Sequence, residues 1–392
     1  MLADYTYELK EIAPEDLDGF MKARDFCAIN VTIPYKQAVI PYLDEISPRA
    51  KDIGVVNTIV NREGKLYGYN TDVLGMRALL SYHEITLTGK EVLILGSGAT
   101  SKTAQALAKE LGAAEIHIVS RSGKGGMTYE EAYVTQRDTQ IIMNTTPCGM
   151  FPDLHSVPLD FSSFAALEGV ADVIYNPLRT ELVLAAKERN IPVAGGLLML
   201  VAQAVCAVEF FLNTSIEEEK IVAIYRKILA QKENIVLIGM PGCGKSTVGK
   251  RLAEQLGRPL IDTDEVICAR YGKTPAEIIE ADGERAFRDL ESAVIREEIA
   301  SRNGCIIATG GGAILRDENV KNLRKNGRLF FLDRPLELLA ISDDRPLSKD
   351  RVLLERRYAE RYDRYCQIAD HMVSPAVELN AICDEIIKEM NV

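Results

Sequence analysis

The stretch NIVLIGMPGCGKSTVGKRLAEQL, residues 234–256, decides the fold of the second half of this chain. An apolar run leads into the glycine-rich loop GMPGCGKS (239–246), and a segment of helical pattern follows at once. The loop matches G-x-x-x-x-G-K-[ST] in full, and in such a loop backbone N–H groups and the start of the helix bind phosphate. We therefore predict a parallel α/β domain that binds a nucleotide. The alternative, a chance glycine-rich turn, accounts for neither the strand nor the helix.

The side chains of this loop have separate expected tasks. Lys245 would reach the β- and γ-phosphates of ATP, and the Ser246 hydroxyl would ligate Mg²⁺. The other expected contacts to the nucleotide come from Gly242, Cys243, Gly244 and Thr247.

The residues that follow two later predicted strands indicate how the phosphate-accepting group is bound. The run RPLI ends in DTD, so Asp262 and Asp264 would lie within reach of the γ-phosphate in a parallel sheet. One carboxylate, which we assign to Asp262, would hold the metal, and the other would accept the proton of an attacking hydroxyl. The alternative is a solvated turn with Asp264 as a helix cap. The run TGGGAI (309–314) would let a ligand approach the backbone closely, or else form a flexible turn.

Three arginines complete the candidates in this half. Arg288, Arg345 and Arg361 lie in segments that could converge on the same mouth, although a single arginine is most often a surface residue. Together with the motifs above, these residues resemble shikimate kinase across residues 233–392. The matched stretches are GMPGCGKST, DTD, GERAFRDLE (283–291), TGGGA, DRPL (344–347) and AERYDRY (359–365).

This resemblance implies a P-loop domain of the nucleoside-monophosphate-kinase type and a role for each residue. Asp264 would bind and deprotonate the acceptor hydroxyl, while Arg288 and Arg361 would hold the shikimate carboxylate beside Gly311. Arg345, in the lid, would close over ATP and stabilise the transferred charge.

Two features modify that assignment. Glu291 follows Arg288 by three residues and could orient it along one helix face. The lid stretch LLAISDDRPL (338–347) is short and lacks a further arginine that many members carry. The absence of this arginine would loosen adenine binding without removing the phosphoryl-transfer chemistry.

The first half carries a different glycine turn. EVLILGSGATSKTAQALA (91–108) places Gly96 and Gly98, followed by Ala99, between a strand and a helix, but Ser101 replaces the third glycine of G-x-G-x-x-G. The next strand, EIHIVS, ends at Ser120 and is followed by Arg121, where an NAD enzyme would carry an acid. Arg121 instead favours the 2′-phosphate of NADP. The alternative is a surface arginine.

Upstream, a lysine and an aspartate each follow a predicted strand. Lys36 comes after INVTI, and Asp72 comes after YGYNT. A lysine near a carbonyl can donate a proton as hydride arrives, and a neighbouring carboxylate can orient it. By spacing alone the interpretation as surface charges is favoured, because nothing in the sequence shows that they meet.

Residues 5–225 resemble shikimate dehydrogenase. The matched stretches are NVTIPYK, GVVNTIV (54–60), GYNTDVLG (68–75), GSGATSKTA, NTTPCGM (144–150), DVIYNPLRT (172–180) and MLVAQA (199–204). The resemblance implies that Lys36 and Asp72 are the catalytic pair. It further implies that substrate contacts come from Thr32, Asn57, Tyr175 and Gln203, with Gly196 near the nicotinamide.

One departure concerns the N-terminus. Members of that family begin with a strand and helix carrying a Ser-x-Ser pair that holds the substrate carboxylate, whereas this chain has no serine before Ser47. Two explanations are open: Met1 is not the natural start, or the dehydrogenase half has lost turnover while keeping NADP binding.

Composition sets the outer limits. The chain has 392 residues and a net charge of −11, which argues against general nucleic-acid binding. Its eight scattered cysteines fit reduced thiols, no secretory signal is evident, and the apolar stretch 194–212 is interrupted by Gln203 and Glu209 and is expected to be a buried helix. We expect a cytoplasmic protein without membrane partners, and the oligomeric state stays open.

The expected organisation is α/β throughout. An incomplete catalytic domain (1–75) precedes a Rossmann NADP-binding domain (76–230) and the P-loop domain (231–392). The expected function is bifunctional: reduction of 3-dehydroshikimate to shikimate, then phosphorylation of shikimate. Alternatives are a kinase fused to a non-catalytic NADP-binding or scaffolding module, and a P-loop regulatory ATPase. Shikimate and quinate are not distinguished as dehydrogenase substrates.

Overall fold

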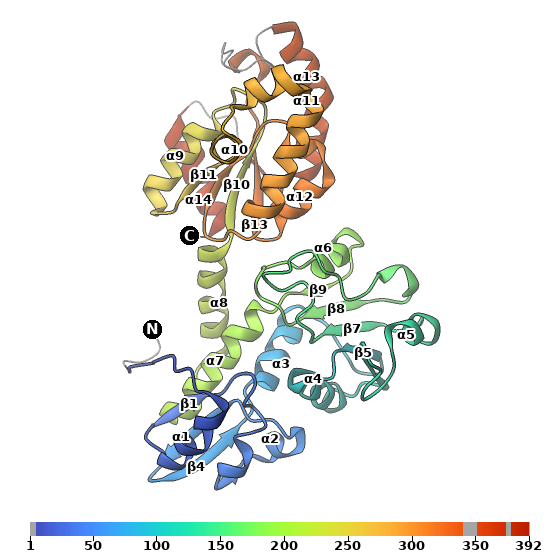
Figure 1. Ribbon diagram of the computed structural model, residues 1–392, viewed down its shortest axis with the longest axis vertical. Helices are drawn as coiled ribbons and strands as arrows, with labels where there is room; N and C mark the ends of the chain where they lie inside the picture. Colours follow the sequence, from blue (N-terminus) through green and yellow to red (C-terminus); the bar gives the residue numbers. More distant parts are fainter. Residues whose placement is uncertain (1–4, 340–350, 374–377, 392) are drawn as a thin grey trace. The chain divides into compact units, whose positions relative to one another are not determined.

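The computed structural model describes residues 5–339, 351–373 and 378–391. Two compact units account for these residues, the first comprising 1–149, 156–175 and 185–225, and the second comprising 150–155, 176–184 and 226–392. Three sheets form the framework, and helix α8 (Glu218–Lys232) carries the chain from the first unit to the second (Figure 1). Within the described residues, no helix is long and apolar enough to cross a membrane.

The first sheet of unit one is mixed and has four strands. Its order is β1 (Ala28–Asn30), β3 (Thr58–Arg62), β4 (Lys65–Tyr69) and β2 (Glu45–Ile46). The stretch NREGK (61–65) predicts a hairpin turn, and strands β3 and β4 form that hairpin. Both turn residues, Glu63 and Gly64, have positive φ angles (53° and 85°), as a tight two-residue turn requires.

The sequence pattern of TYELKEI (6–12) predicts a strand, and this prediction is wrong. Residues 5–13 form no strand, and the side chains of Tyr7 and Leu9 are 55% and 95% exposed. A strand is stable when a neighbour completes its hydrogen bonds and covers its apolar side chains. In the described residues β1 pairs only with β3, and the segment 5–13 has neither kind of support.

The second sheet of unit one is parallel, as predicted. Its order is β6 (Glu115–Val119), β5 (Glu91–Leu95), β7 (Ile141–Asn144), β8 (Gly169–Asp172) and β9 (Val193–Ala194). The chain leaves β5 to one side for β6 and returns to the other side for β7, so β5 ends at the switch point where open α/β sheets bind ligands.

Helices cover these two sheets. They are α1 (Leu17–Ala23), α2 (Pro48–Ile53), α3 (Asp72–Tyr82), α4 (Ala99–Glu110), α5 (Tyr129–Thr135) and α7 (Leu197–Leu212), with α6 (Glu181–Glu188) continuing from the second unit into the first. The predicted buried helix within 194–212 is confirmed as α7. It packs closely on α3, since a Cβ at Gly75 would lie 2.5 Å from the Met199 carbonyl oxygen.

The second unit is built on one parallel sheet. Its order is β11 (Leu260–Asp262), β12 (Ile306–Ala308), β10 (Asn234–Ile238), β13 (Gly327–Leu332) and β14 (His371–Val373). The α-helices are α9 (Lys245–Leu256), α10 (Thr263–Tyr271), α11 (Pro275–Val294), α12 (Asp317–Arg324), α13 (Arg351–Ile368) and α14 (Leu379–Met390). Helix α11 is kinked at Gly283, whose φ is 88°. The fully buried strand β10 pairs in parallel with β12 and β13 and confirms the predicted parallel α/β fold.

Short helical turns complete both units. They are η1 (Pro14–Asp16), η2 (Ile40–Tyr42), η3 (Phe161–Ser163), η5 (Ala313–Leu315), η6 (Leu336–Leu338) and the π-type η4 (Ile295–Ile299).

Candidate functional site

Lys36 and Asp72 meet in the first unit. The Lys36 Nζ lies 2.6 Å from the Asp72 Oδ2, and the two side chains are only 15% and 11% exposed. Asp72 is the first residue of α3, where the unpaired peptide N–H groups favour a carboxylate. A short pair of this kind holds the ammonium in a fixed direction, which is what a positioned proton donor needs.

A polar network surrounds Thr71, the residue just before Asp72. The Asn57 Oδ1 accepts the backbone N–H of Thr71 (2.7 Å), and the Thr71 hydroxyl donates to the Gln203 Oε1 (3.4 Å). The network therefore joins two expected substrate contacts, Asn57 and Gln203, through Thr71. Thr32 and Tyr175 are exposed, and within the described residues neither side chain hydrogen-bonds to this network.

The glycine turn after β5 has the form expected of a dinucleotide site. Gly96 has a φ of 110°, and a Cβ there would lie 2.8 Å from the Thr145 Oγ1, so both backbone and space require glycine. Gly98 precedes α4, and a Cβ added to it would meet no atom within 4 Å. The start of α4 at Ala99 is therefore open to a ligand.

The three remaining cofactor candidates of this unit are Ser120, Arg121 and Gly196, and they differ in their surroundings. After β6, Ser120 is buried and donates to the Lys124 carbonyl oxygen (3.2 Å), while Arg121 is exposed and able to reach a phosphate. A Cβ at Gly196 would lie 2.1 Å from the Val173 carbonyl oxygen. Packing accounts for that glycine, and its nearness to a nicotinamide stays a prediction.

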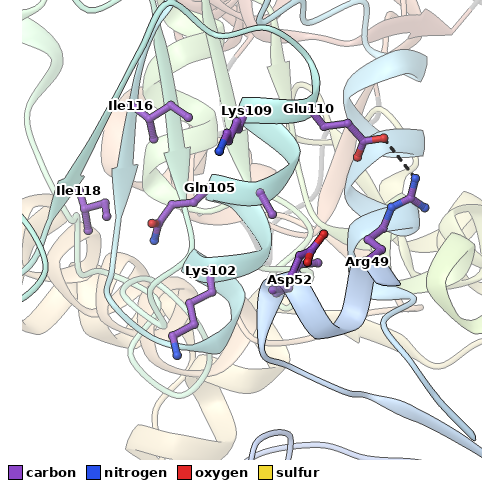
Figure 2. A pocket seen from close by; sticks show the side chains of 10 residues that line it. Arg49, Asp52, Lys102, Gln105, Lys109, Glu110, Ile116 and Ile118 are labelled. Carbon is purple, nitrogen blue, oxygen red and sulfur yellow. Dashed lines mark hydrogen bonds and ion pairs between the residues drawn. The ribbon is translucent and has the colours of Figure 1, made fainter. Parts of the chain in front are cut away.

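Figure 2 shows a groove of about 900 Å³ elsewhere in this unit. Side chains of α4, α2 and β6 line it, and the ion pair of Arg49 with Glu110 (3.1 Å) lies at one end. None of the predicted site residues is among its lining residues.

In the second unit the loop between β10 and α9 forms a cradle. Its glycines at 239, 242 and 244 have φ angles of 147°, 82° and 101°, which turn successive N–H groups toward one point. Lys245 is buried, and its Nζ donates to the carbonyl oxygens of Gly239 (2.8 Å) and Met240 (3.0 Å). Cys243 is buried in the loop, and Thr247 is exposed in the first turn of α9.

The DTD stretch lies at the same sheet edge. The Ser246 hydroxyl donates to the Asp262 Oδ2 (2.8 Å), and the Asp262 Oδ1 accepts the backbone N–H of Asp264 (3.0 Å). The cap of α10 is therefore Asp262, and the alternative that Asp264 is the cap is wrong. Because Asp262 already makes the capping contact, Asp264 can face the ligand side.

Arg288 and Glu291 of α11 lie against the TGGGA loop (309–313), close to Asp264. The Arg288 Nη1 donates to the Glu291 Oε2 (2.7 Å), as the helix spacing suggested. A Cβ at Gly312 would lie 2.1 Å from the Arg288 guanidinium, and one at Gly310 would lie 2.5 Å from the Glu291 Oε1 and 3.2 Å from the Asp264 Oδ1. These glycines make room for the charged side chains.

Burial sets the ionisation of this pair. It raises the pKa of the Glu291 carboxyl, an effect that Arg288 only partly offsets and that Asp264 reinforces. Burial alone would lower the pKa of Arg288, but Glu291 and Glu284 outweigh it and the pKa is raised. The guanidinium therefore stays charged and available for an anion.

Helix α13 contributes two further side chains to this site, Arg361 and Tyr365. The Arg361 Nη1 donates to the Gly311 carbonyl oxygen (3.3 Å), and the Tyr365 hydroxyl donates to the carbonyl oxygen of Gly239 (2.9 Å) and contacts that of Gly311. Tyr365 thus ties the phosphate cradle to the TGGGA loop. Arg345 lies outside the described residues.

Both halves of the chain match known protein families. A family model described as shikimate dehydrogenase substrate binding domain matches residues 2–59, and one described as shikimate kinase matches residues 241–391. The shikimate dehydrogenase (NADP(+)) of Clostridium beijerinckii is 36% identical over 232 residues, which cover 56% of this chain and 85% of that protein. The chain belongs to the shikimate dehydrogenase family. Its residues 241–391 form a shikimate kinase domain.

Solved structures agree over the first half. Shikimate dehydrogenase 1 from Peptoclostridium difficile matches with a TM-score of 0.51 at 37% identity, covering 56% of this chain and 84% of that chain. A chorismate mutase/shikimate 5-dehydrogenase fusion protein from Clostridium acetobutylicum matches with a TM-score of 0.53 at 30% identity and the same coverage. In that fusion protein the shikimate 5-dehydrogenase is joined to a second enzyme, chorismate mutase.

The kinase domain fits Mg·ATP by the chemistry of its donors. Within the described residues there is no group of three or more His, Cys, Asp or Glu that could hold a metal by itself. Mg²⁺ is commonly bound by one or two protein oxygens together with substrate phosphates and water, and Ser246 and Asp262 offer such oxygens beside the cradle.

Sequence reasoning missed several residues of the two sites. Thr71 and Tyr365 stand inside the matched motifs, but only the fold shows that they link the site elements. Gly312 stands out in the sequence as one of three consecutive glycines, without any sign of its closeness to Arg288. Glu284 accepts a hydrogen bond from the Arg288 Nη2 (3.2 Å). It lies in the GERAFRDLE motif, and nothing else in the sequence marks it as a site residue.

Proposed function

We propose that this chain is a bifunctional enzyme that reduces 3-dehydroshikimate to shikimate with NADPH and phosphorylates shikimate with Mg·ATP. One observation supports it above others: the two family folds each keep their charged groups assembled, Lys36 with Asp72 at 2.6 Å and Arg288 with Glu291 at 2.7 Å. The first product is the second substrate, which gives the union of the two domains a chemical reason.

In the first reaction Lys36 is the proton donor. NADPH, when bound, supplies the hydride to the carbonyl carbon. The Lys36 ammonium gives its proton to the carbonyl oxygen, and Asp72 orients that ammonium. Asn57, Thr32, Tyr175 and Gln203 are proposed to hold the substrate. Arg121 beyond Ser120 would bind the 2′-phosphate, Gly98 leaves room for the cofactor at the start of α4, and Gly96, Ala99 and Gly196 would be further cofactor contacts.

In the second reaction Asp264 is the base. It accepts the proton of the shikimate 3-hydroxyl as that oxygen attacks the γ-phosphorus of ATP. Arg288 and Arg361 hold the carboxylate beside Gly311, and Lys245 neutralises charge on the phosphates. The remaining loop contacts are Gly242, Cys243, Gly244, Ser246 and Thr247, with Asp262 on the Mg²⁺ side and Arg345 over ATP.

The proposal includes the division of the chain. Residues 1–75 and 76–230 would form the substrate and NADP-binding domains of the dehydrogenase, and 231–392 the kinase. The net charge of −11 and the small anionic ligands favour small-molecule partners in the cytoplasm over nucleic acid or membrane.

Two separate assays on the full chain test this. NADP⁺ reduction is measured with shikimate and with quinate, and phosphate transfer from ATP is measured with shikimate. Both activities are expected, and the two acceptors show which one the dehydrogenase prefers. Phosphorylation without NADP⁺ reduction would instead support a kinase fused to a catalytically impaired dehydrogenase-like module. ATP hydrolysis that shikimate does not stimulate would support a regulatory ATPase.

A further inference from the structure

A second arginine of α13 faces the same side as Arg361. The buried side chains of this helix are Leu354, Arg357, Arg361, Tyr365 and Ile368, a spacing that defines one helix face. Arg357 is 7% exposed and Arg361 is 5% exposed. Buried arginines are rare unless a counter-charge or an anionic ligand lies close to them.

Three guanidinium groups gather around one carboxylate of α11. Glu284 Oε1 lies 3.2 Å from the Arg288 Nη2 and 3.9 Å from the Arg361 Nη2, and its Oε2 lies 3.9 Å from the Arg357 Nη2. Helices α11 and α13 lie side by side at this end of the unit (Figure 1). Glu284 is 42% exposed, so it reaches these arginines from the solvent side.

Arginines and carboxylates are crowded together in this cluster. The three guanidiniums share it with Glu284, Glu291 and Asp264, and burial raises the pKa of the Glu291 carboxyl. Burial, together with Arg361 and Arg288, lowers the pKa of Arg357, which shows how unfavourable its surroundings are for a further cation. An anion placed among the three arginines would remove this repulsion.

We propose that Arg357 is a third guanidinium of the site that holds the carboxylate of the kinase substrate. Glu284 keeps the three arginines together when no substrate is bound, and its two 3.9 Å ion pairs are longer than hydrogen bonds and easily exchanged for a substrate carboxylate. This inference rests on the proposed kinase function and adds to it a residue that sets specificity for a carboxylate over a neutral group.

The test compares a charged and an uncharged acceptor in the full chain. Phosphorylation kinetics are measured with shikimate and with its methyl ester for the wild type and Arg357→Met. The KM for shikimate should rise about 10- to 30-fold, the effect of losing one hydrogen bond to a charged group. The KM for the ester, the KM for ATP and kcat should change less than about threefold, as expected for uniform binding of one substrate group.

Arg356→Met is the matched control. Arg356 is the residue of α13 just before Arg357, but it is 75% exposed and pairs with Glu360 along the helix. The control should leave all four constants unchanged. If Arg357→Met does not fold, judged by circular dichroism, Arg357→Lys decides: a KM for shikimate raised about 3- to 10-fold with an unchanged ester KM supports the proposal.

Other outcomes overturn it. An unchanged KM for shikimate in either variant shows that Arg357 does not hold the carboxylate, and an equal rise for acid and ester shows a packing role. If the wild type neither binds nor phosphorylates shikimate, the proposed kinase function itself fails and takes this inference with it. If the wild type phosphorylates shikimate and the Arg357 variant has the same KM for shikimate, only this inference fails and the proposed kinase function stands.

Discussion

The two sites of this protein assemble in different ways. In the second unit, the phosphate cradle, Asp262, Asp264 and the TGGGA loop all follow strands of one parallel sheet and meet at its carboxyl edge. In the first unit, Lys36 and Asp72 flank strands of a mixed sheet, while the glycine turn belongs to a separate parallel sheet. One site therefore depends on the topology of a single sheet, and the other on two sheets in one unit.

This difference predicts how separable the two activities are. The kinase groups depend on strands β10–β12 and helices α9–α13, and the dehydrogenase pair depends on β1, β4 and α3. A substitution that removes one reacting group without disturbing a strand should leave the other reaction unchanged.

The largest effect is expected for Lys36→Ala. Loss of the proton donor should lower dehydrogenase turnover by about 10²- to 10⁴-fold, with little change in NADP affinity. Kinase kcat should stay at the wild-type value. Spectrophotometric NADP⁺ reduction and NADP titration measure the first two quantities. Lys51→Ala, an exposed lysine of α2, is the control. Equal losses of turnover and NADP affinity would show that Lys36 has a structural role.

Asp264→Asn tests the same separation from the other side. Without the base, kinase kcat should fall about 10²- to 10³-fold, while ATP still binds because the cradle is untouched. Dehydrogenase activity should not change. Glu265→Gln is the matched control, since Glu265 is exposed on the next position of α10. ATP turnover that survives Asp264→Asn would contradict the assigned base and favour a regulatory ATPase.

The single-sheet site was also the more predictable from sequence. The order of strand, loop and helix around Lys245 indicated a parallel sheet, and parallel strands place their carboxyl ends together, so Asp262 was expected near Ser246. No periodicity could show that Lys36 and Asp72 meet, because their contact depends on how β1, β4 and α3 pack. The same reason hid Thr71 and Tyr365, whose hydrogen bonds cross between elements far apart in the chain.

The strand predicted for TYELKEI failed for a related reason. Its alternation of apolar and polar residues is a local property, but a strand also needs a neighbouring edge. Side-chain contacts there, such as the hydrogen bond from the Tyr7 hydroxyl to the Asn30 Oδ1 (3.1 Å), do not form a ladder.

A smaller effect is expected for Arg121→Ala. If Arg121 binds the 2′-phosphate, the KM for NADP should rise about 10- to 30-fold, the equivalent of one charge-assisted hydrogen bond, and the KM for NAD should not change. Kinase constants should be unaffected. Lys109→Ala provides the control, because Lys109 is an exposed residue in the last turn of α4, at the opposite end of the helix from the glycine turn. A KM that rises equally for NADP and NAD would place Arg121 elsewhere on the cofactor.

The smallest effect compares the two glycine turns directly. Gly244 has a φ of 101°, so Gly244→Ala should cost about 1 kcal/mol or more of unfolding free energy in the second unit, even though its Cβ would meet only the Arg334 Nη1 at 3.7 Å. Gly98 has a φ of −86° and open space around its Cβ position, so Gly98→Ala should leave the unfolding free energy unchanged or slightly higher.

At Gly98 we expect an effect on cofactor binding in place of an effect on stability. The space in front of α4 is where the pyrophosphate of NADP would approach the backbone, so Gly98→Ala should raise the KM for NADP in a protein of normal stability. Thermal unfolding without ligands and NADP kinetics separate the two effects. An unstable Gly98→Ala protein would mean that this glycine serves the fold, whereas a stable protein with an unchanged KM for NADP would mean that the cofactor does not pass over this turn.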